Sequence, residues 1–211
     1  MRKLLFSILL LSVSSFALSL NQVRADLKTT ALAQDSVEMS IRTTVNSSVG
    51  KQTISIYMVK KGAAKIYTEM KAPFISQRSI VNGSRMKVVD LKTNKVQILP
   101  YNGEVLGSKT LSKINPLDTG DWQEPVFVSE NLYKITGSKG TAYYNSKSKR
   151  IEKFESSDAE KSSLTTFTYD AENNLKTMEV SVIAGDMETK VTTEILALRS
   201  SKKFPDKLFD F

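Results

Sequence analysis

The sequence predicts a mainly β protein built on one curled antiparallel sheet, and three observations support this. Apolar and polar residues alternate over much of the 211-residue chain, which is the period of a strand with one buried face. Short turn segments rich in Gly, Asn and Pro separate these stretches, which favours pairing between neighbouring strands. We expect about 10–11 strands, and an open sheet of that size curls into a half-barrel with a concave face.

The N-terminal segment 1–19 is interpreted as a cleaved secretory signal peptide. Arg2 and Lys3 precede an apolar run over residues 4–11, and small residues follow, which is the order of such a signal. The run is too short to cross roughly 30 Å of hydrocarbon as a helix. Ala17-Leu18-Ser19 favours a cut after Ser19, and Val23-Arg24-Ala25 offers a second cut after Ala25. Residues 20–211 are then expected to form a single domain.

A short amphipathic helix and two strands are expected next. Apolar residues recur at helical spacing over residues 20–33, beginning with Leu20, Val23 and Leu27. The period then changes to two: Val37, Met39 and Ile41 alternate with polar residues, and so do the apolar residues of 54–58. Both of these stretches indicate half-buried strands.

Residues 53–100 predict a meander of about five antiparallel strands. A strand over 64–70 ends before Pro73, and residues 79–81 lead into Asn82-Gly83, the commonest signal of a two-residue hairpin turn. Strands over 86–89 and 96–99 follow, separated by a turn through 90–94.

The region 104–130 interrupts this pattern. Residues 108–114 predict a short helix, and the prolines and glycine that follow exclude regular structure around Trp122. We interpret the region as a lid or an insertion. Strands resume over 132–136, 141–144, 150–155, 163–169, 175–183 and 188–198, and Gly185-Asp186 suits a tight hairpin.

The composition excludes several kinds of site. The chain has no Cys and no His, so thiol nucleophiles, His-dependent triads and His- or Cys-ligated zinc are ruled out. Without Cys, neither a disulfide nor a lipoprotein-type lipid anchor can form. The acids Asp118, Asp121 and Glu124 lack the spacing of a calcium loop. No catalytic constellation stands out, and we expect no enzyme activity, no cofactor and no metal site.

The net charge is +8. The basic residues are scattered and do not interleave with aromatic residues, which argues against nucleic-acid binding. A weakly cationic surface could still approach anionic membranes or partners.

Several motifs occur in an order that resembles a known superfamily. Tyr57–Met70 combines a strand, a basic turn and a strand; residues 80–83 form a hairpin signal; and Asp121-Trp122 follows the candidate helix. The segment 203–209 is similar to a closing "P-x-x-x-F" strand. This order resembles the LolA/LolB/RseB-like superfamily, most of all its outer-membrane lipoprotein-sorting members. Lys61 stands where that family often has an Arg that closes the half-barrel by bonding to the lid.

The resemblance implies a half-barrel with short lid helices in its concave face, in which acyl chains bind. Met residues suit such an adaptable apolar site, although ordinary core packing also explains them. The residues expected to form the ligand cavity and its lid are Met58, Lys61, Ile66, Tyr67, Met70, Ile80, Met86, Val88, Leu111, Ile114 and Trp122.

The resemblance also implies a place and a role. The expected function is that of a monomeric periplasmic carrier, or chaperone, for an acylated lipoprotein or a lipid. Its expected partners are a donor at the inner membrane and an acceptor at the outer membrane. The alternative is an RseB-like sensor or protein-interaction scaffold with the same fold.

Overall fold

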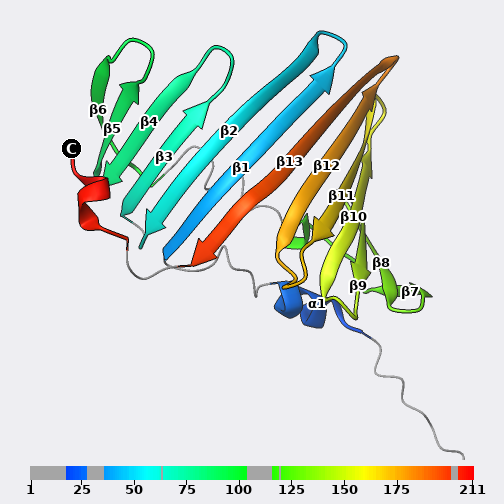
Figure 1. Cartoon of the computed structure of the whole chain (residues 1–211). Helices are drawn as coiled ribbons and strands as arrows, with labels where there is room; N and C mark the ends of the chain where they lie inside the picture. Colours follow the sequence, from blue (N-terminus) through cyan, green and yellow to red (C-terminus); the bar gives the residue numbers. More distant parts are fainter. Residues whose placement is uncertain (1–17, 28–35, 63, 104–115, 119, 201–203) are drawn as a thin grey trace, which may run out of the picture.

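The computed structural model describes residues 18–27, 36–62, 64–103, 116–118, 120–200 and 204–211. Its main feature is one antiparallel sheet of 13 strands, which curls without closing into a barrel (Figure 1). The strands are β1 Ser36–Ser47, β2 Gly50–Lys61, β3 Lys65–Lys71, β4 Ser76–Asn82, β5 Arg85–Asp90, β6 Val96–Pro100, β7 Val126–Ser129, β8 Leu132–Gly137, β9 Gly140–Asn145, β10 Arg150–Ser157, β11 Lys161–Tyr169, β12 Leu175–Ala184 and β13 Met187–Ser200. The described ranges also contain three short helical elements: α1 Leu20–Leu27, η2 Pro116–Asp118 and η3 Asp206–Phe209.

Two meanders make up the sheet. Strands β1 to β6 follow one another outward on one side, and β13 to β7 do so on the other, so that β6 and β7 are the edges. The pairing of β1 with β13 joins the two meanders, from Val37 opposite Ser200 to Asn46 opposite Lys190. The hydroxyl groups of Thr43 and Thr193 lie 3.1 Å apart across this junction.

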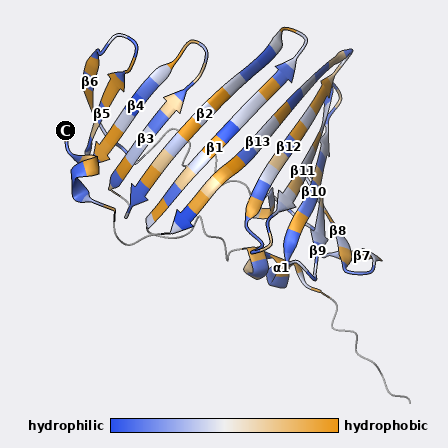
Figure 2. Ribbon diagram, viewed as in Figure 1, coloured by the Kyte–Doolittle hydropathy of each residue, from blue (hydrophilic) through white to orange (hydrophobic). Residues whose placement is uncertain are grey.

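The alternation of side chains divides the sheet into two faces. Met58 pairs with Met39 and Thr68, and these side chains share what we call the inner face. Val59 pairs with Glu38 and Tyr67 on the opposite, outer face. Figure 2 shows this alternation as apolar and polar bands that follow one another along the strands.

Each face carries its own apolar packing. On the inner face, Met39, Ile41, Met58, Ile66 and Val81 form one buried cluster on β1 to β4. A second inner-face cluster lies on β8 to β10 and includes residues of α1 and η2: Leu20, Val23, Leu117, Ile135, Ala142, Tyr144 and Ile151. A third cluster lies on the outer face, where Phe209 of η3 packs with Val59 and Ile80.

Most of the expected elements are confirmed. The meander over 53–100 corresponds to β2 to β6, and the helix expected from Leu20 is α1 as far as Leu27, where the described range stops. The hairpin expected at Asn82-Gly83 is present one residue further along: Asn82 pairs with Arg85, so Gly83 and Ser84 form the turn, and Gly83 has a positive φ of 64°.

Two expectations need correction. The sheet has more strands than the 10–11 expected, and one of them, β7, lies in the region predicted to lack strands. The closing strand expected near the C-terminus is instead the 3₁₀ helix η3, which follows Pro205 and packs on the outer face. The helix expected over 108–114 lies outside the described residues. None of the helices in the described ranges has the length and apolar character to cross a bilayer.

Candidate ligand-binding face

The inner face of the central strands carries three rows of side chains that cross the sheet. The first runs Thr165, Val180, Val191, Val45, Gln52; the second runs Phe167, Met178, Thr193, Thr43, Ile54; and the third runs Ile195, Ile41, Ile56, Met70, Gln77. We call these rows the central apolar face. They contain no acidic or basic side chain, although a quarter of the whole chain is charged (25%).

The central apolar face is only partly covered. Ile41 is buried, whereas Ile54, Ile56 and Met70 are half-buried, as are the valines of the first row. The cluster around Met58, nearer the lower ends of the same strands in Figure 1, is by contrast buried. Apolar area that remains accessible on an otherwise well-packed sheet is the surface that an apolar ligand would cover.

Thr68 is a buried polar residue of the inner face beside this surface. Thr68 is 9% exposed, and its Oγ1 atom has no hydrogen-bond partner among the described residues. It lies between Met58 on β2 and Ser79 on β4. A buried hydroxyl without a partner costs about 1–3 kcal/mol, and the Thr68 hydroxyl is too deeply buried to be open to a ligand on the central apolar face.

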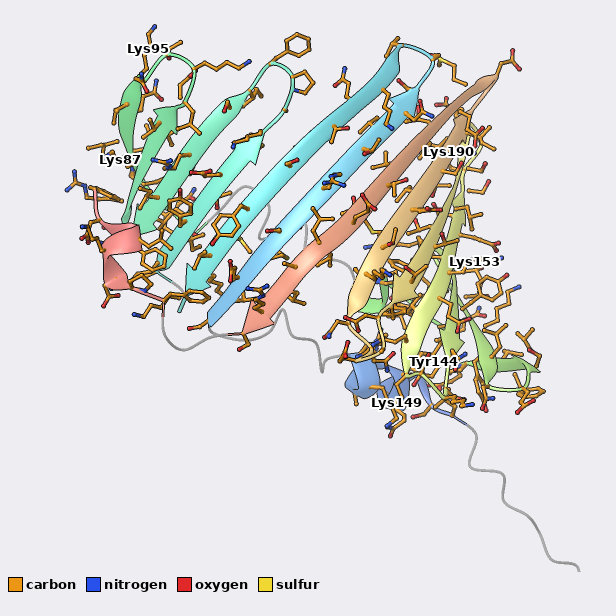
Figure 3. All side chains as sticks on the ribbon, viewed as in Figure 1. Lys87, Lys95, Tyr144, Lys149, Lys153 and Lys190 are labelled. Atoms are coloured by element: carbon orange, nitrogen blue, oxygen red, sulfur yellow. The ribbon has the colours of Figure 1, made fainter. Side chains whose placement is uncertain are left out.

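The inner face of β8 to β10 is filled from within the chain. Val23 of α1 is fully buried there, and the Tyr144 hydroxyl donates to Asp26 Oδ2 over 2.7 Å. Figure 3 places Tyr144 and Lys149 beside α1. The Leu20 backbone nitrogen donates to Glu124 Oε2 over 2.8 Å. These contacts fix α1 on one part of the inner face and leave the central apolar face beside it.

The residues expected to form the cavity divide between the two faces. Met58 and Ile66 are buried on the inner face, where Met70, Met86 and Val88 are half-buried. Lys61, Tyr67 and Ile80 lie on the outer face. Trp122 packs against the cluster under α1 and meets Phe154 edge to face, with 6.1 Å between ring centroids. Leu111 and Ile114 lie outside the described residues.

Lys61 holds the C-terminal segment. Its Nζ atom donates to the Phe204 carbonyl oxygen over 3.1 Å and to Asp206 Oδ1 over 3.0 Å. Lys65 Nζ donates to the same Asp206 oxygen over 2.7 Å. These bonds from Lys65 and Lys61 lower the pKa of Asp206 from 3.8 to about 2. The described contact of Lys61 is therefore with the outer-face segment, and the lid that it was expected to bind lies outside the described range.

Tyr67 belongs to a polar network on the outer face. Its hydroxyl donates to Glu69 Oε1 over 2.5 Å, and Arg78 donates to the same oxygen through Nη2 over 2.7 Å. Burial, together with the neighbouring Glu69 carboxylate, raises the pKa of Tyr67 to about 12. This network satisfies its members and directs the Tyr67 hydroxyl away from the central apolar face.

The acidic residues form no metal centre in the part of the chain that the structure describes, where no group of three or more potential ligands comes together. Glu124, one of the three loop acids considered from the sequence, instead accepts a hydrogen bond from the Leu20 nitrogen.

Known proteins resemble this chain in structure rather than in sequence. No family model matches it, and no curated protein matches it. A LolA superfamily protein from Nitrosomonas europaea superimposes with a TM-score of 0.56 at 13% identity, covering 92% of this chain and 99% of that one.

A DUF1329 family protein from Desulfovibrio piger superimposes with a TM-score of 0.50 at 10% identity, covering 89% of this chain and 94% of that one.

The chain has a LolA-like fold.

The expected family resemblance is thereby confirmed for the fold. A putative outer membrane lipoprotein-sorting protein domain from Vibrio parahaemolyticus also matches, at 8% identity and a TM-score of 0.49, with 90% of this chain and 95% of that one covered. At sequence identities this low, the similarity shows a shared fold and nothing about function.

The sequence alone did not single out the central apolar face. Several of its members, such as Val180 and Val191, lie on long C-terminal strands for which the sequence predicts a strand and nothing more. Their signal was alternation, which identifies a face but not its accessibility.

Proposed function

We propose that this LolA-like protein is a periplasmic carrier that binds the acyl chains of a lipoprotein or lipid on its central apolar face. One observation carries the proposal: most side chains of the three uncharged inner-face rows remain half-exposed on a curled sheet. The signal-like N-terminal sequence supports export, and the fold of the Nitrosomonas europaea protein supports the family role.

The energetics favour an aliphatic ligand. Each methylene group removed from water contributes roughly 0.8 kcal/mol, so one long chain laid along the rows supplies useful affinity before any specific contact forms. Charged ligands gain nothing there, because the rows hold no opposite charge.

The carrier role includes transfer between partners. An inner-membrane donor would load the acyl chains, and an outer-membrane acceptor would remove them. Because the binding is apolar and weakly directional, chains of different length would be accepted.

The proposal is tested by binding of a triacyl lipopeptide, followed by displacement of a fluorescent fatty acid. Ile56→Glu places a carboxylate in the third row and should weaken binding at least tenfold, because a buried charge without a partner is strongly unfavourable.

Ser55→Glu is the matched control. It lies next to Ile56 on β2, faces outward and pairs with Arg42 and Lys71, so the new carboxylate is accommodated and binding should not change. Circular dichroism establishes whether both variants fold. If Ile56→Glu does not fold, Ile56→Ser replaces it as a milder polar substitution at the same position. Equal affinity of both variants, or no binding by the unmodified protein, would rule out this face as the acyl site.

A further inference from the structure

Residues 18–20 are part of the folded domain. Leu18 packs against the inner-face cluster that includes Leu20, Val23 and Tyr144. Figure 1 shows this segment entering α1 beside the lower ends of β9 to β11. The chain immediately before α1 therefore contributes apolar contacts to the core of the protein.

Ser19 is the N-cap of α1. Its Oγ atom accepts a hydrogen bond from the Gln22 backbone nitrogen over 3.2 Å, and its carbonyl oxygen accepts one from the Val23 nitrogen over 3.1 Å. The first backbone N–H groups of a helix have no partner within the helix, and Ser is among the residues that best supply one. Loss of Ser19 would leave both nitrogens without these acceptors.

The backbone nitrogen of Leu20, the first residue of α1, also has a hydrogen-bond partner. The Leu20 nitrogen donates to Glu124 Oε2, and the two residues are 104 positions apart in the sequence. This contact would survive a cut directly before Leu20, whereas the contacts of Ser19 and Leu18 would not. A cut that keeps all of these contacts must therefore lie before Leu18.

We propose that signal peptidase cleaves this chain between Ala17 and Leu18. Ser15 and Ala17 are small residues at the two positions that the peptidase reads before its cut. One water molecule hydrolyses the Ala17–Leu18 peptide bond, leaving a carboxylate on Ala17 and an ammonium group on Leu18. This inference concerns maturation and does not depend on the acyl-binding proposal.

The two cuts favoured by the sequence alone remove parts of the domain. A cut after Ser19 deletes the N-cap and the Leu18 contact. A cut after Ala25 deletes most of α1, including the fully buried Val23, and leaves only two helical residues beside Tyr144. A cut after Ala17 keeps every one of these contacts.

The direct test is the intact mass of the mature protein. The full chain, with a C-terminal affinity tag, is expressed in a double-membraned bacterium, and the protein recovered from the periplasm is weighed and its N-terminus sequenced. We expect it to begin at Leu18. A mature protein that begins at Leu20 or Asp26, or one that keeps residues 1–17, overturns the proposal. Ala17→Leu enlarges the residue before the cut and should abolish processing there.

A second measurement tests the structural reason. Two chains that begin at Leu18 and at Leu20 are each released from a cleavable N-terminal fusion and compared by thermal unfolding. The Leu20 chain should have a Tm lower by roughly 2–4 °C, as expected for the loss of a helix cap. In the Leu18 chain, Ser19→Ala should lower the Tm and Ser19→Asp, which keeps a capping oxygen, should preserve it. Equal Tm values for all four chains overturn the argument from Ser19.

Discussion

The contact between Tyr144 and Asp26 joins α1 to the sheet through a buried and a partly buried side chain. Tyr144 has no exposed surface, and the Asp26 side chain is 11% exposed. Burial acts to raise the pKa of Asp26, but hydrogen bonds from Tyr144, Gln22 and Lys149 outweigh it and lower that pKa. Burial and the Asp26 carboxylate raise the pKa of Tyr144. The pair is therefore a neutral phenol that donates to a charged carboxylate.

Tyr144→Phe keeps the ring and removes this donor. We expect a loss of about 1–3 kcal/mol in the free energy of unfolding, because the buried carboxylate loses one of its hydrogen bonds. Urea denaturation measures the loss. Tyr143→Phe is the control: Tyr143 is the neighbouring residue on the outer face, half-exposed, and bonded to Glu155 over 3.0 Å. The free energy of unfolding of Tyr143→Phe should fall by no more than about 0.5 kcal/mol. Equal losses of stability in Tyr143→Phe and Tyr144→Phe would contradict this account.

Asp206 makes the attachment of the C-terminal segment depend on pH. Its pKa is about 2 in the folded protein and 3.8 ordinarily. A carboxyl group with a lowered folded pKa stabilises the fold above its ordinary pKa, and this contribution is lost as the pH falls toward the folded value. The ion pairs with Lys61 and Lys65 should therefore weaken between about pH 4 and pH 2.

Asp206→Asn removes this dependence. At pH 6 the variant should have a lower Tm than the unmodified protein, and at pH 2 the difference should be much smaller, because Asp206 is then about half protonated in the folded protein and almost fully protonated in the unfolded chain. Thermal unfolding followed by circular dichroism at both pH values gives the comparison. A difference in Tm that is the same at pH 6 and pH 2 would show that the charge of Asp206 contributes nothing.

At the scale of the elements, the chain before β7 lies against β8. Trp122 forms a bridge with Gly137, and the Gln123 nitrogen donates to the Thr136 carbonyl oxygen over 2.8 Å. The indole ring crosses Gly137 and reaches Phe154. A Cβ atom on residue 137 would lie 2.5 Å from Trp122 Cε3, which is closer than atoms can approach. Gly137 is therefore required for the ring to pack on the sheet.

Gly137→Ala should displace the Trp122 ring toward water. We expect Trp emission to shift to longer wavelength and the protein to lose about 1–3 kcal/mol of stability through overpacking. Trp122 is the single Trp of the chain, so the emission reports this site alone. Ser138→Ala, at the exposed neighbouring position, should leave the spectrum unchanged. An unshifted spectrum for Gly137→Ala would mean that the ring does not depend on the glycine.

The same region shows why some elements could be predicted and others could not. Strands β2 to β5 alternate or end at recognisable turns, so sequence reasoning found them. Strand β7 has four residues, Val126–Ser129, all exposed, and it lacks the alternation that reveals a buried face. Its position comes from pairing with Tyr133 and Lys134 of β8, which is a tertiary contact.

The candidate site was predictable only in part for a related reason. Tyr57 and Val59 present an aromatic ring and an aliphatic group between Ile56, Met58 and their neighbours, so β2 has no strictly polar face at this point. Phe209 covers this part of the outer face from 150 residues further along the chain. Alternation could therefore predict that Tyr67 and Met70 lie on opposite faces, but not which face remains accessible.

The whole molecule depends on one junction between its two meanders. Strands β1 and β13 pair along nearly their full length, although the inner-face clusters on either side are separate: one lies on β1 to β4 and the other under α1 on β8 to β10. Because a continuous ladder connects them, opening one meander would expose the inner edge of the other. We expect the two to unfold as one cooperative unit.

Met58→Ala tests this coupling across the sheet. Met58 is 7% exposed in the β1–β4 cluster, and its truncation should cost about 2–5 kcal/mol. Trp122 lies in the other cluster, so its fluorescence reports the far meander. If the sheet is cooperative, the urea midpoint followed by Trp122 falls by the same amount as that followed by circular dichroism, because the far meander cannot stay folded without β1 beside β13. A Trp122 midpoint that stays at its original value while the circular dichroism midpoint falls would show two independent halves. An acyl ligand that spans the rows from β11 to β4 would then bind across a hinge rather than on one rigid face.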